Sequence, residues 1–476
     1  MMKSKFLFLL FISLFISCKT GEKSPVKKEM PQSLVSDKMM ESAVIYEANI
    51  RQYSPEGTFN AFTKDIPVLK KLGVKIIWLM PVFPISETKR KATGDTFVSD
   101  IKDKEERKKY LGSYYAVSNY REVSADYGTK DDLRNLIKTA HQNNIIVILD
   151  WVPNHTGWDH KWIKEHPEYY TKNDKGEITD PLNDDGSSKG WQDVADLDYS
   201  NKGLRKAMTA DMKYWLTNEG IDGFRCDVAG EVPTSFWKKA IPELRSVKPI
   251  FMLAEAWEPE LLKGDKLFDM CYGWENHFLM ADIAQGKKTV KDWDNYIVKT
   301  DTMYEKDDII MNFTENHDEN SWKGTVNHTF GDATEIMAVL TYMTLGMPLI
   351  YSGQEYDLNK QLKFFEKDTI PKTKGKFFDL YVKLAKLKNS NIALNGGKNK
   401  ADYIRISTSN DTDVLAFHRT KNGKKVVFIG NLTNQTQRFT INLKGTFNES
   451  LKSKKIILQK GQELTLKPWN YLILTN

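Results

Sequence analysis

Short apolar segments alternate with amphipathic segments along most of the chain. The apolar segments are rich in Ile, Val, Leu and Phe, which is typical of strands buried on both faces of a parallel sheet. Stretches with the 3.6-residue spacing of a helix lie between them, for example 62–72, 202–219 and 231–246. The pattern predicts eight strands, within 44–50, 73–80, 145–150, 221–227, 250–255, 267–271, 309–318 and 345–353.

This repeat of strand and helix indicates the fold class. Eight parallel strands with alternating helices predict an α/β fold, a (β/α)8 TIM barrel over 41–393, whose catalytic groups would lie at the carboxyl ends of the strands. Two segments interrupt the repeat. We interpret 154–197 as an inserted domain after the third strand, and the charged segment 87–109 as a solvated loop. The alternating pattern of 394–476 predicts a C-terminal antiparallel β-sandwich domain.

Of the predicted strands, those that end at Asp227, Glu255 and Asp318 carry the candidate catalytic carboxylates. Because side chains two apart on a strand share a face, Arg225 should hold Asp227 charged and oriented, as a nucleophile requires. Glu255 ends a different strand, where burial near another anion would raise its pKa and suit a general acid. The pair predicts glycoside hydrolysis with retention, with carboxyls about 5 to 5.5 Å apart. A carboxylate in this position can also be a helix N-cap, but three in matching contexts favour chemistry.

Four segments carry a resemblance to a known family. DWVPNH at 150–155, GFRCD at 223–227, AEAW at 254–257 and ENHD at 315–318 resemble, in this order, the conserved regions of the α-amylase family, glycoside hydrolase family 13. The resemblance extends from about Tyr46 to the C-terminus. It implies a barrel enzyme acting on α-glucans.

The resemblance also assigns roles to individual residues. It implies that Asp227 is the nucleophile, Glu255 the general acid/base, and Asp318 the carboxylate that binds ring hydroxyls and stabilises the transition state. Asp150 either supports this site or serves as a structural hydrogen-bonding group, and Trp257 either stacks on sugar or packs. The residues implied or considered for substrate binding are Tyr115, His155, Arg225, His317 and Trp257.

No cofactor is expected to be required, but calcium is a candidate. Many members of the family bind a structural calcium, and Asn154 and Asp196 match two of its ligands. Gly230 and Glu231 replace a Lys-His pair that provides another ligand in those relatives. Calcium takes several oxygen ligands, so Asn154 and Asp196 are kept as candidates only.

The N-terminus indicates where the protein acts. A basic start and a short apolar run followed by Ile-Ser-Cys resemble a bacterial lipoprotein signal peptide over 1–18, with Cys18 as the lipidated residue. Residues 19–40 read as a flexible tether. We therefore expect an exported lipoprotein of the outer membrane. The net charge of +6 comes from dispersed lysines, and with no nucleic-acid-binding motif no nucleic-acid partner is expected.

The predicted function is retaining hydrolysis of α-1,4-glucosidic bonds in starch, maltodextrin or related α-glucans. By analogy with the family, Asp198 at the end of Ala-Asp-Leu-Asp favours α-1,4 over α-1,6 bonds. The same machinery would serve an α-glucan transferase or an α-glucosidase specific for trehalose or sucrose. A barrel that binds glycans without cleaving them is disfavoured by the intact carboxylates. The sequence leaves the oligomeric state open.

Overall fold

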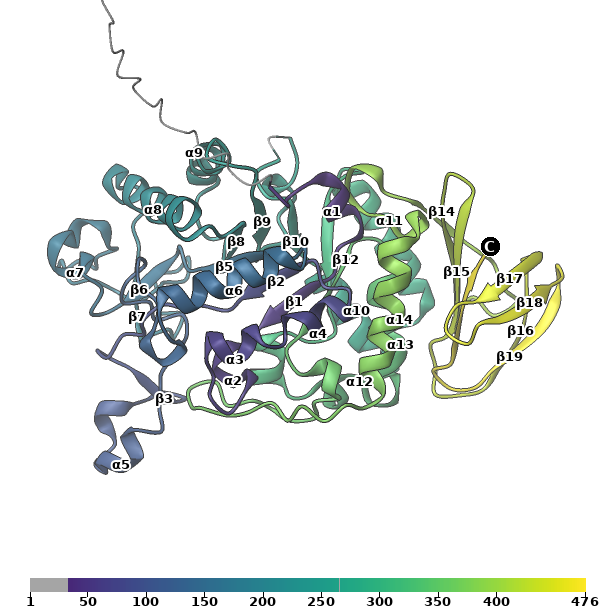
Figure 1. Cartoon of the computed structure of the whole chain (residues 1–476), viewed down its shortest axis with the longest axis horizontal. Coiled ribbons are helices and arrows are strands. Elements are labelled where there is room, and N and C mark those ends of the chain that lie inside the picture. The colour runs from purple at the N-terminus through teal and green to yellow at the C-terminus, as the bar shows by residue number, and fades with distance from the viewer. Residues whose placement is uncertain (1–32, 265) are drawn as a thin grey trace, which may run out of the picture. The chain divides into compact units, whose positions relative to one another are not determined.

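The computed structural model of the protein describes residues 33–264 and 266–476 (Figure 1). The predicted signal peptide 1–18, with its lipidation site Cys18, lies outside the described residues, as does most of the predicted tether. Among the residues that are described, no helix has the length and apolar character needed to cross a membrane.

The end of the predicted tether is ordered. Helix α1 (Asp37–Ser42) is capped by the Ser36 hydroxyl, which accepts from the Met39 amide, and the buried Glu41 accepts from Asn395 Nδ2 at 3.2 Å. Met39 and Met40 pack against the apolar interior of the barrel. The predicted tether, which extended to residue 40, was therefore too long, because Met39 and Met40 bury apolar surface against the barrel.

The predicted TIM barrel is confirmed. Eight parallel strands close in the order β1-β12-β11-β10-β9-β8-β5-β2. In the register of β5 and β8, Asp150 lies opposite Arg225, and Arg225 lies opposite Leu253 of β9. This register sets the predicted catalytic residues side by side. The strands are β1 (Ile45–Ala48), β2 (Ile76–Leu79), β5 (Ile146–Trp151), β8 (Gly223–Cys226), β9 (Phe251–Ala254), β10 (Met270–Tyr272), β11 (Ile309–Asn312) and β12 (Met347–Tyr351).

Helices surround the barrel (Figure 1). The predicted helix 62–72 is two short helices in the structure, because Pro67 starts a second helix after Asp65. The predicted helix 202–219 is α8 followed by a π-helical turn that ends at Gly220 in the left-handed region. The helices are α2 (Ile50–Tyr53), α3 (Phe59–Thr63), α4 (Ile66–Lys71), α6 (Lys130–Gln142), α8 (Lys202–Tyr214), α9 (Thr234–Arg245), α10 (Trp274–Ala284), α11 (Val290–Met303), α12 (Val326–Phe330), α13 (Thr334–Met343) and α14 (Lys376–Ser390).

Alternate side chains of the strands form two layers. Inward residues such as Ile45, Ile148 and Leu253 fill the barrel interior, and outward residues such as Phe224 and Cys226 pack with the surrounding helices. Cys226 and Cys271 are buried free thiols. Because the lower inward positions are apolar and closely filled, the polar inward residues gather at the carboxyl ends of the strands.

Two segments outside the barrel lie at the carboxyl ends of its strands. The segment 154–197 contains the antiparallel pair β6 (His155–Gly157) and β7 (Val194–Asp196), with α7 (Trp162–Glu165) between them. The charged segment 87–109 is not simply a solvated loop. It forms the hairpin β3 (Lys91–Thr93) and β4 (Thr96–Phe97), followed by α5 (Lys104–Arg107).

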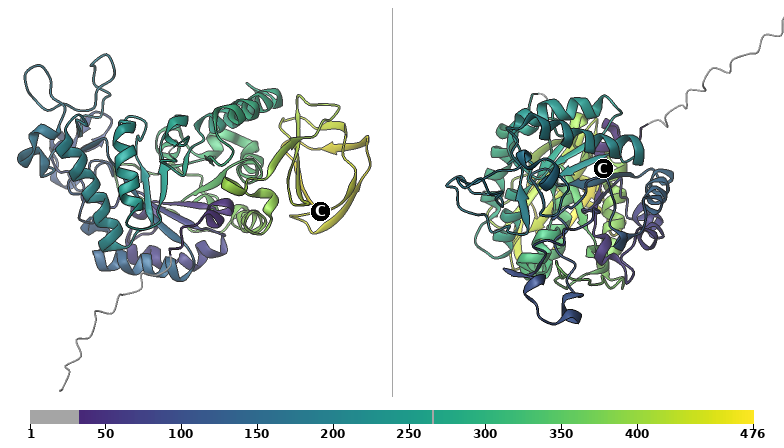
Figure 2. Two further views of the ribbon diagram at one scale, coloured as in Figure 1. Left: turned by 90° about the horizontal axis from the view of Figure 1, so that it is seen from above. Right: turned by 90° about the vertical axis from the view of Figure 1, so that its left-hand side faces the viewer.

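The C-terminal strands form a group of their own, drawn in yellow in Figure 2. A six-stranded sheet and a two-stranded sheet enclose an apolar cluster that includes Val427 and Phe439. Buried Arg419 donates to the carbonyls of Thr344 at 2.6 Å and Asn395 at 2.8 Å, which joins this domain to the barrel. The strands are β13 (Asp402–Arg405), β14 (Val414–Lys421), β15 (Lys424–Asn431), β16 (Gln437–Ile441), β17 (Gly445–Glu449), β18 (Lys454–Leu458), β19 (Gln462–Leu466) and β20 (Tyr471–Thr475).

Candidate active site

A cavity of about 420 Å³ opens at the carboxyl ends of the barrel strands. Its walls come from strand ends, from the segment 154–197, from the charged segment 87–109 and from loops near 322 and 364. Six of the predicted site residues line it, namely Tyr115, His155, Asp227, Glu255, His317 and Asp318. The structure therefore brings together residues that lie up to 203 positions apart in the sequence, from 115 to 318.

Arg225 is the centre of the polar array below the cavity. Its Nη1 donates to Asp150 Oδ1 at 2.9 Å and to Asp227 Oδ1 at 2.8 Å. Its Nη2 lies 2.9 Å from Glu255 Oε1, an ion pair without hydrogen-bond geometry. Nε donates to the Tyr272 hydroxyl at 3.0 Å. One fully buried guanidinium thus contacts and orients three carboxyl groups.

Glu255 is held at both oxygens. Oε1 pairs with Arg225, and Oε2 accepts from the Val228 amide at 2.7 Å. Val228 has a φ of 37°, in the left-handed region that a β-branched residue rarely adopts. This backbone conformation accompanies the direct approach of its N–H group to the carboxylate.

Burial and mutual repulsion shape the charges of this array. Burial raises the pKa of Glu255 to about 7, with Arg225 opposing the rise and Asp227 adding to it. Burial likewise raises the pKa of Asp227 to about 6, while Arg225 opposes. Burial thus favours a proton on this pair of carboxyls, while Arg225 favours their ionised form. One carboxyl can donate a proton while the other is ionised, which is the division of labour that a glycosidase needs.

His317 connects the array to strand β1. Its Nδ1 lies 2.6 Å from Glu47 Oε1, which also accepts from the His317 amide at 3.3 Å. Its Nε2 lies 2.7 Å from the Tyr115 hydroxyl, which in turn donates to Asp150 Oδ2 at 3.1 Å. Burial lowers the pKa of His317, but Asp318 and Glu47 outweigh it and raise the pKa to about 9. The imidazole is therefore charged at neutral pH and bridges Glu47 and Tyr115.

Three residues of this network were missed from the sequence. Glu47 is fully buried on β1, the Trp78 indole donates to Asp150 Oδ2 at 3.1 Å, and Tyr272 receives the Arg225 Nε. Each stands at an inward position near the carboxyl end of a predicted strand. The alternation that placed Arg225 beside Asp227 also places Glu47 two residues after the inward Ile45. A polar residue two positions after an inward apolar residue, near the end of a predicted strand, was the sequence signal that could have identified Glu47.

The upper walls are aromatic. Trp322 packs on Phe364 and Phe365 with ring centroids 4.9 and 5.9 Å apart, and all three line the cavity. Trp191 lines another wall and contacts the ring of His155, whose pKa burial lowers to about 3. Exposed aromatic faces beside carboxylates suit a sugar, which has apolar ring faces and polar edges.

Trp257 does not join this cavity. Strand β9 ends at Ala254, and the chain turns after Glu255, so the alternation that would have kept residues 255 and 257 on one side is lost. The Trp257 side chain is 58% exposed and lines a different groove. Trp257 therefore does not line the catalytic cavity, and its stacking on sugar stays a prediction.

The two candidate calcium ligands lie in the segment 154–197, on and beside β6 and β7. Asp196 Oδ2 accepts from the Thr171 hydroxyl at 2.6 Å, and burial raises its pKa to about 6. The ammonium of Lys189 pairs with Glu231 and also favours ionised Asp196. A lysine thus supplies positive charge next to these acids. Asn154 and Asp196 supply two of the several oxygen ligands that calcium takes, and the positive charge of Lys189 beside them disfavours a second cation. The residues therefore do not fit the expected calcium site, and no mechanistic step uses a metal.

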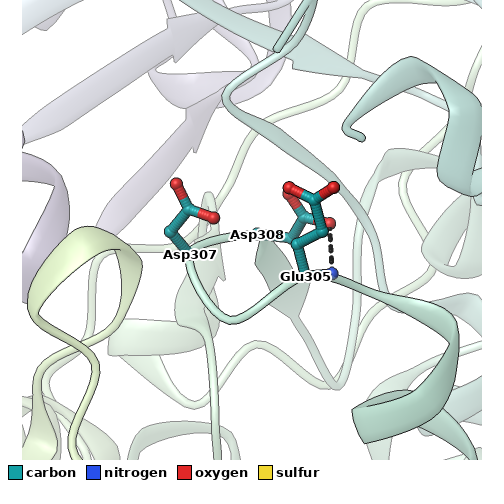
Figure 3. A group of neighbouring side chains, drawn as sticks. All are labelled: Glu305, Asp307 and Asp308. Carbon is teal, nitrogen blue, oxygen red and sulfur yellow. Dashed lines mark hydrogen bonds between the residues drawn. The ribbon is translucent and has the colours of Figure 1, made fainter. Parts of the chain in front are cut away.

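A group of three acidic residues stands elsewhere, at Glu305, Asp307 and Asp308 (Figure 3). The Lys266 ammonium lies 2.9, 2.8 and 2.9 Å from their respective carboxylates. An intramolecular cation therefore occupies the centre of this group. Among the described residues no other cluster of three or more His, Cys, Asp or Glu side chains brings ligand atoms this close.

Buried carboxyl groups held by one arginine at the carboxyl ends of the strands of a (β/α)8 barrel are the arrangement of a glycosidase. The family model described as the alpha amylase catalytic domain matches residues 31–413, and the chain belongs to the alpha-amylase family. Alpha-amylase 3 of Dictyoglomus thermophilum is 24% identical over 91% of this chain and 93% of its own length. A maltogenic alpha-amylase structure from Thermotoga neapolitana is 27% identical, with a TM-score of 0.79 over 91% of this chain and 98% of its own. An alpha-amylase structure from Lactobacillus plantarum is 27% identical, with a TM-score of 0.78 over 93% and 100%.

Replacing Glu47 with Gln tests the bridge through His317. The amide keeps the hydrogen bond but removes the charge that raises the pKa of His317, so that pKa should fall. Imidazole resonances in ¹⁵N-detected NMR spectra should show His317 charged through pH 7 in the parent and losing its proton at lower pH in Glu47→Gln. An unchanged titration of His317 would contradict the assignment, and Glu305→Gln, a charge removal at the surface, is the matched control.

Chelation tests the misfit of the calcium site. Because Lys189 already pairs with Glu231 and favours ionised Asp196, EDTA should shift the melting temperature by less than about 2 °C. Differential scanning fluorimetry before and after chelation measures this. A larger drop that added calcium reverses would show that Asn154 and Asp196 recruit further oxygen ligands.

Proposed function

We propose that the enzyme hydrolyses α-1,4-glucosidic bonds of starch-like glucans with retention, through a covalent glycosyl-enzyme intermediate. The observation that carries the proposal is the Arg225 array. Two neighbouring nitrogens of one guanidinium hold Asp227 and Glu255, which keeps the two carboxyls close, as a retaining enzyme requires. Asp318 lines the same cavity.

In the first step Asp227 attacks the anomeric carbon. Its Oδ1 is held by Arg225, so Oδ2 is the oxygen that forms the bond to the sugar. The bond between that carbon and the leaving glycosidic oxygen breaks, and Glu255 transfers its proton to this oxygen. The raised pKa of Glu255 allows it to carry the proton near neutral pH.

In the second step the ionised Glu255 removes a proton from a water molecule, whose oxygen attacks the same carbon and releases Asp227. Glu255 is then protonated again, and the anomeric configuration is that of the substrate. Asp318 and His317 bind ring hydroxyls, and Tyr115, 5.5 Å from His317 between ring centroids, offers its ring to the sugar.

A transferase is the second candidate. The aromatic wall of Trp322, Phe364 and Phe365 at the cavity could hold an acceptor sugar in place of water. The relatives include both a cyclomaltodextrinase and a cyclomaltodextrin glucanotransferase, at 23% and 24% identity. We favour water as the acceptor.

Incubation with maltoheptaose in H₂¹⁸O tests both the machinery and the acceptor. The enzyme should give shorter sugars with the label at their new reducing ends, and Asp227→Asn should lose at least about 10³-fold in kcat, because the amide cannot form the intermediate. Asp379→Asn, an exposed change of the same kind on α14, should keep full activity. Unlabelled products longer than the substrate would identify a transferase, and activity of Asp227→Asn near the parent would overturn the nucleophile.

We also propose that the protein is exported and held on the outer membrane by lipids on Cys18. The support is the sequence pattern before this cysteine. Since the acyl chains would be the anchor, Cys18→Ala should move the protein from the membrane fraction to the soluble fraction of cells. A mutant that stays with the membrane would show that the anchor is not at Cys18.

A further inference from the structure

A second groove, separate from the catalytic cavity, has the composition of a sugar-binding surface. It has a volume of about 650 Å³ and lies between the loop after β9, the start of α10 and the helix α11. Trp257 and Phe278 line it with side chains 58% and 52% exposed. Exposed apolar side chains that gather in one groove rimmed by polar residues, rather than singly, are typical of a ligand-binding surface. In the part of the chain that the structure describes, the other aromatic among the large exposed apolar residues is Trp322 at the catalytic cavity.

The rings of the groove are arranged as a surface. Trp274 and Phe278 are stacked, with centroids 5.7 Å apart and planes 19° from parallel, so each ring supports the other on α10. The Tyr304 hydroxyl donates to the Trp257 carbonyl at 2.8 Å, which fixes the loop that carries the exposed indole. The apolar faces are therefore supported by contacts with the body of the protein.

The charges around the groove select a neutral ligand. Its charged lining residues are Glu258, Glu275, Lys288 and Lys299, two of each sign. Lys299 Nζ lies 2.9 Å from both oxygens of Glu275, so that pair is already neutralised. A phosphate-bearing or strongly basic partner would meet no complementary field here. A neutral polyhydroxyl chain would find aromatic faces for its ring carbons and carboxylate and ammonium groups for its hydroxyls.

The groove adjoins the catalytic array. Trp257 follows Glu255 by two residues, and Tyr272 lines the groove while its hydroxyl receives the Arg225 Nε at 3.0 Å. Glu255 lines the catalytic cavity and Trp257 lines the groove, so the loop after β9 contributes a residue to each. A glucan that is too long for the cavity has a second aromatic surface beside it.

We propose that this groove is a second binding site for an α-glucan chain, which holds polymeric substrate next to the catalytic cavity. The proposal rests on the proposed function, since it takes the same substrate class. The groove proposal adds that Trp257 and Phe278, which have no catalytic role, determine the preference for long or granular substrate over short sugars.

The test uses the full-length chain with Asp227→Asn, which binds glucan without consuming it, and starch granules as the probe. Adding Phe278→Ala or Trp257→Ala should weaken binding to granules about tenfold each, as expected for the loss of one stacking ring. Val298→Ala removes an exposed apolar side chain of α11 that does not line the groove, and it should bind like its parent. In the active background, Phe278→Ala should lose at least about fivefold more rate on granules than on maltotriose.

Phe278 stands on a helix away from Glu255, so its result does not depend on whether Trp257→Ala disturbs the catalytic loop. Granule binding within twofold of the parent in both variants would overturn the proposal. Light scattering that shows a dimer split by Phe278→Ala would also overturn it, because the groove would then be an interface between copies. A parent that releases no reducing ends from maltoheptaose would instead overturn the proposed function, whatever the granule result.

Discussion

The buried guanidinium of Arg225 is the constraint on which the site depends. A charge without exposure to water is costly unless it is paired and hydrogen-bonded, and Arg225 meets that condition by contacting Asp150, Asp227, Glu255 and Tyr272. The carboxylates need it equally, because three anions this close would otherwise repel one another. Removing one partner from such a group typically costs about 3–5 kcal/mol. Stability and catalytic geometry are therefore set by the same contacts.

Much of the fold follows from patterns that the sequence displays directly. Apolar runs with intervening helical spacing predict the barrel, and the two-residue period predicts that Arg225 and Asp227 share a face. The walls of the cavity could not be found in this way. Trp191, Phe364 and Phe365 lie on loops, where no periodicity constrains the direction of a side chain. Trp257 lies outside the cavity for the same reason, since the regular geometry of β9 ends before it.

Lysines take the place expected for a cation at two acidic groups. Lys189 pairs with Glu231 near Asp196, and Lys266 stands among Glu305, Asp307 and Asp308. An ammonium on the chain needs no recruitment from solution, whereas a metal site remains filled only while the free ion exceeds its dissociation constant. Lys189 and Lys266 thus supply positive charge beside these acids whenever the chain is folded.

The contact between Glu47 and His317 joins residues 270 positions apart. It spans the closure of the barrel, where β1 pairs with β12 about 300 residues later in the chain. Such long-range pairings form slowly, because a large loop must be closed before any contact repays the entropy. The helices and the strands between β1 and β12 can be formed while His317 still lacks the negative charge of Glu47. Recovery of activity during refolding would therefore follow the joining of the first strand to the last, and would lag behind the recovery of secondary structure.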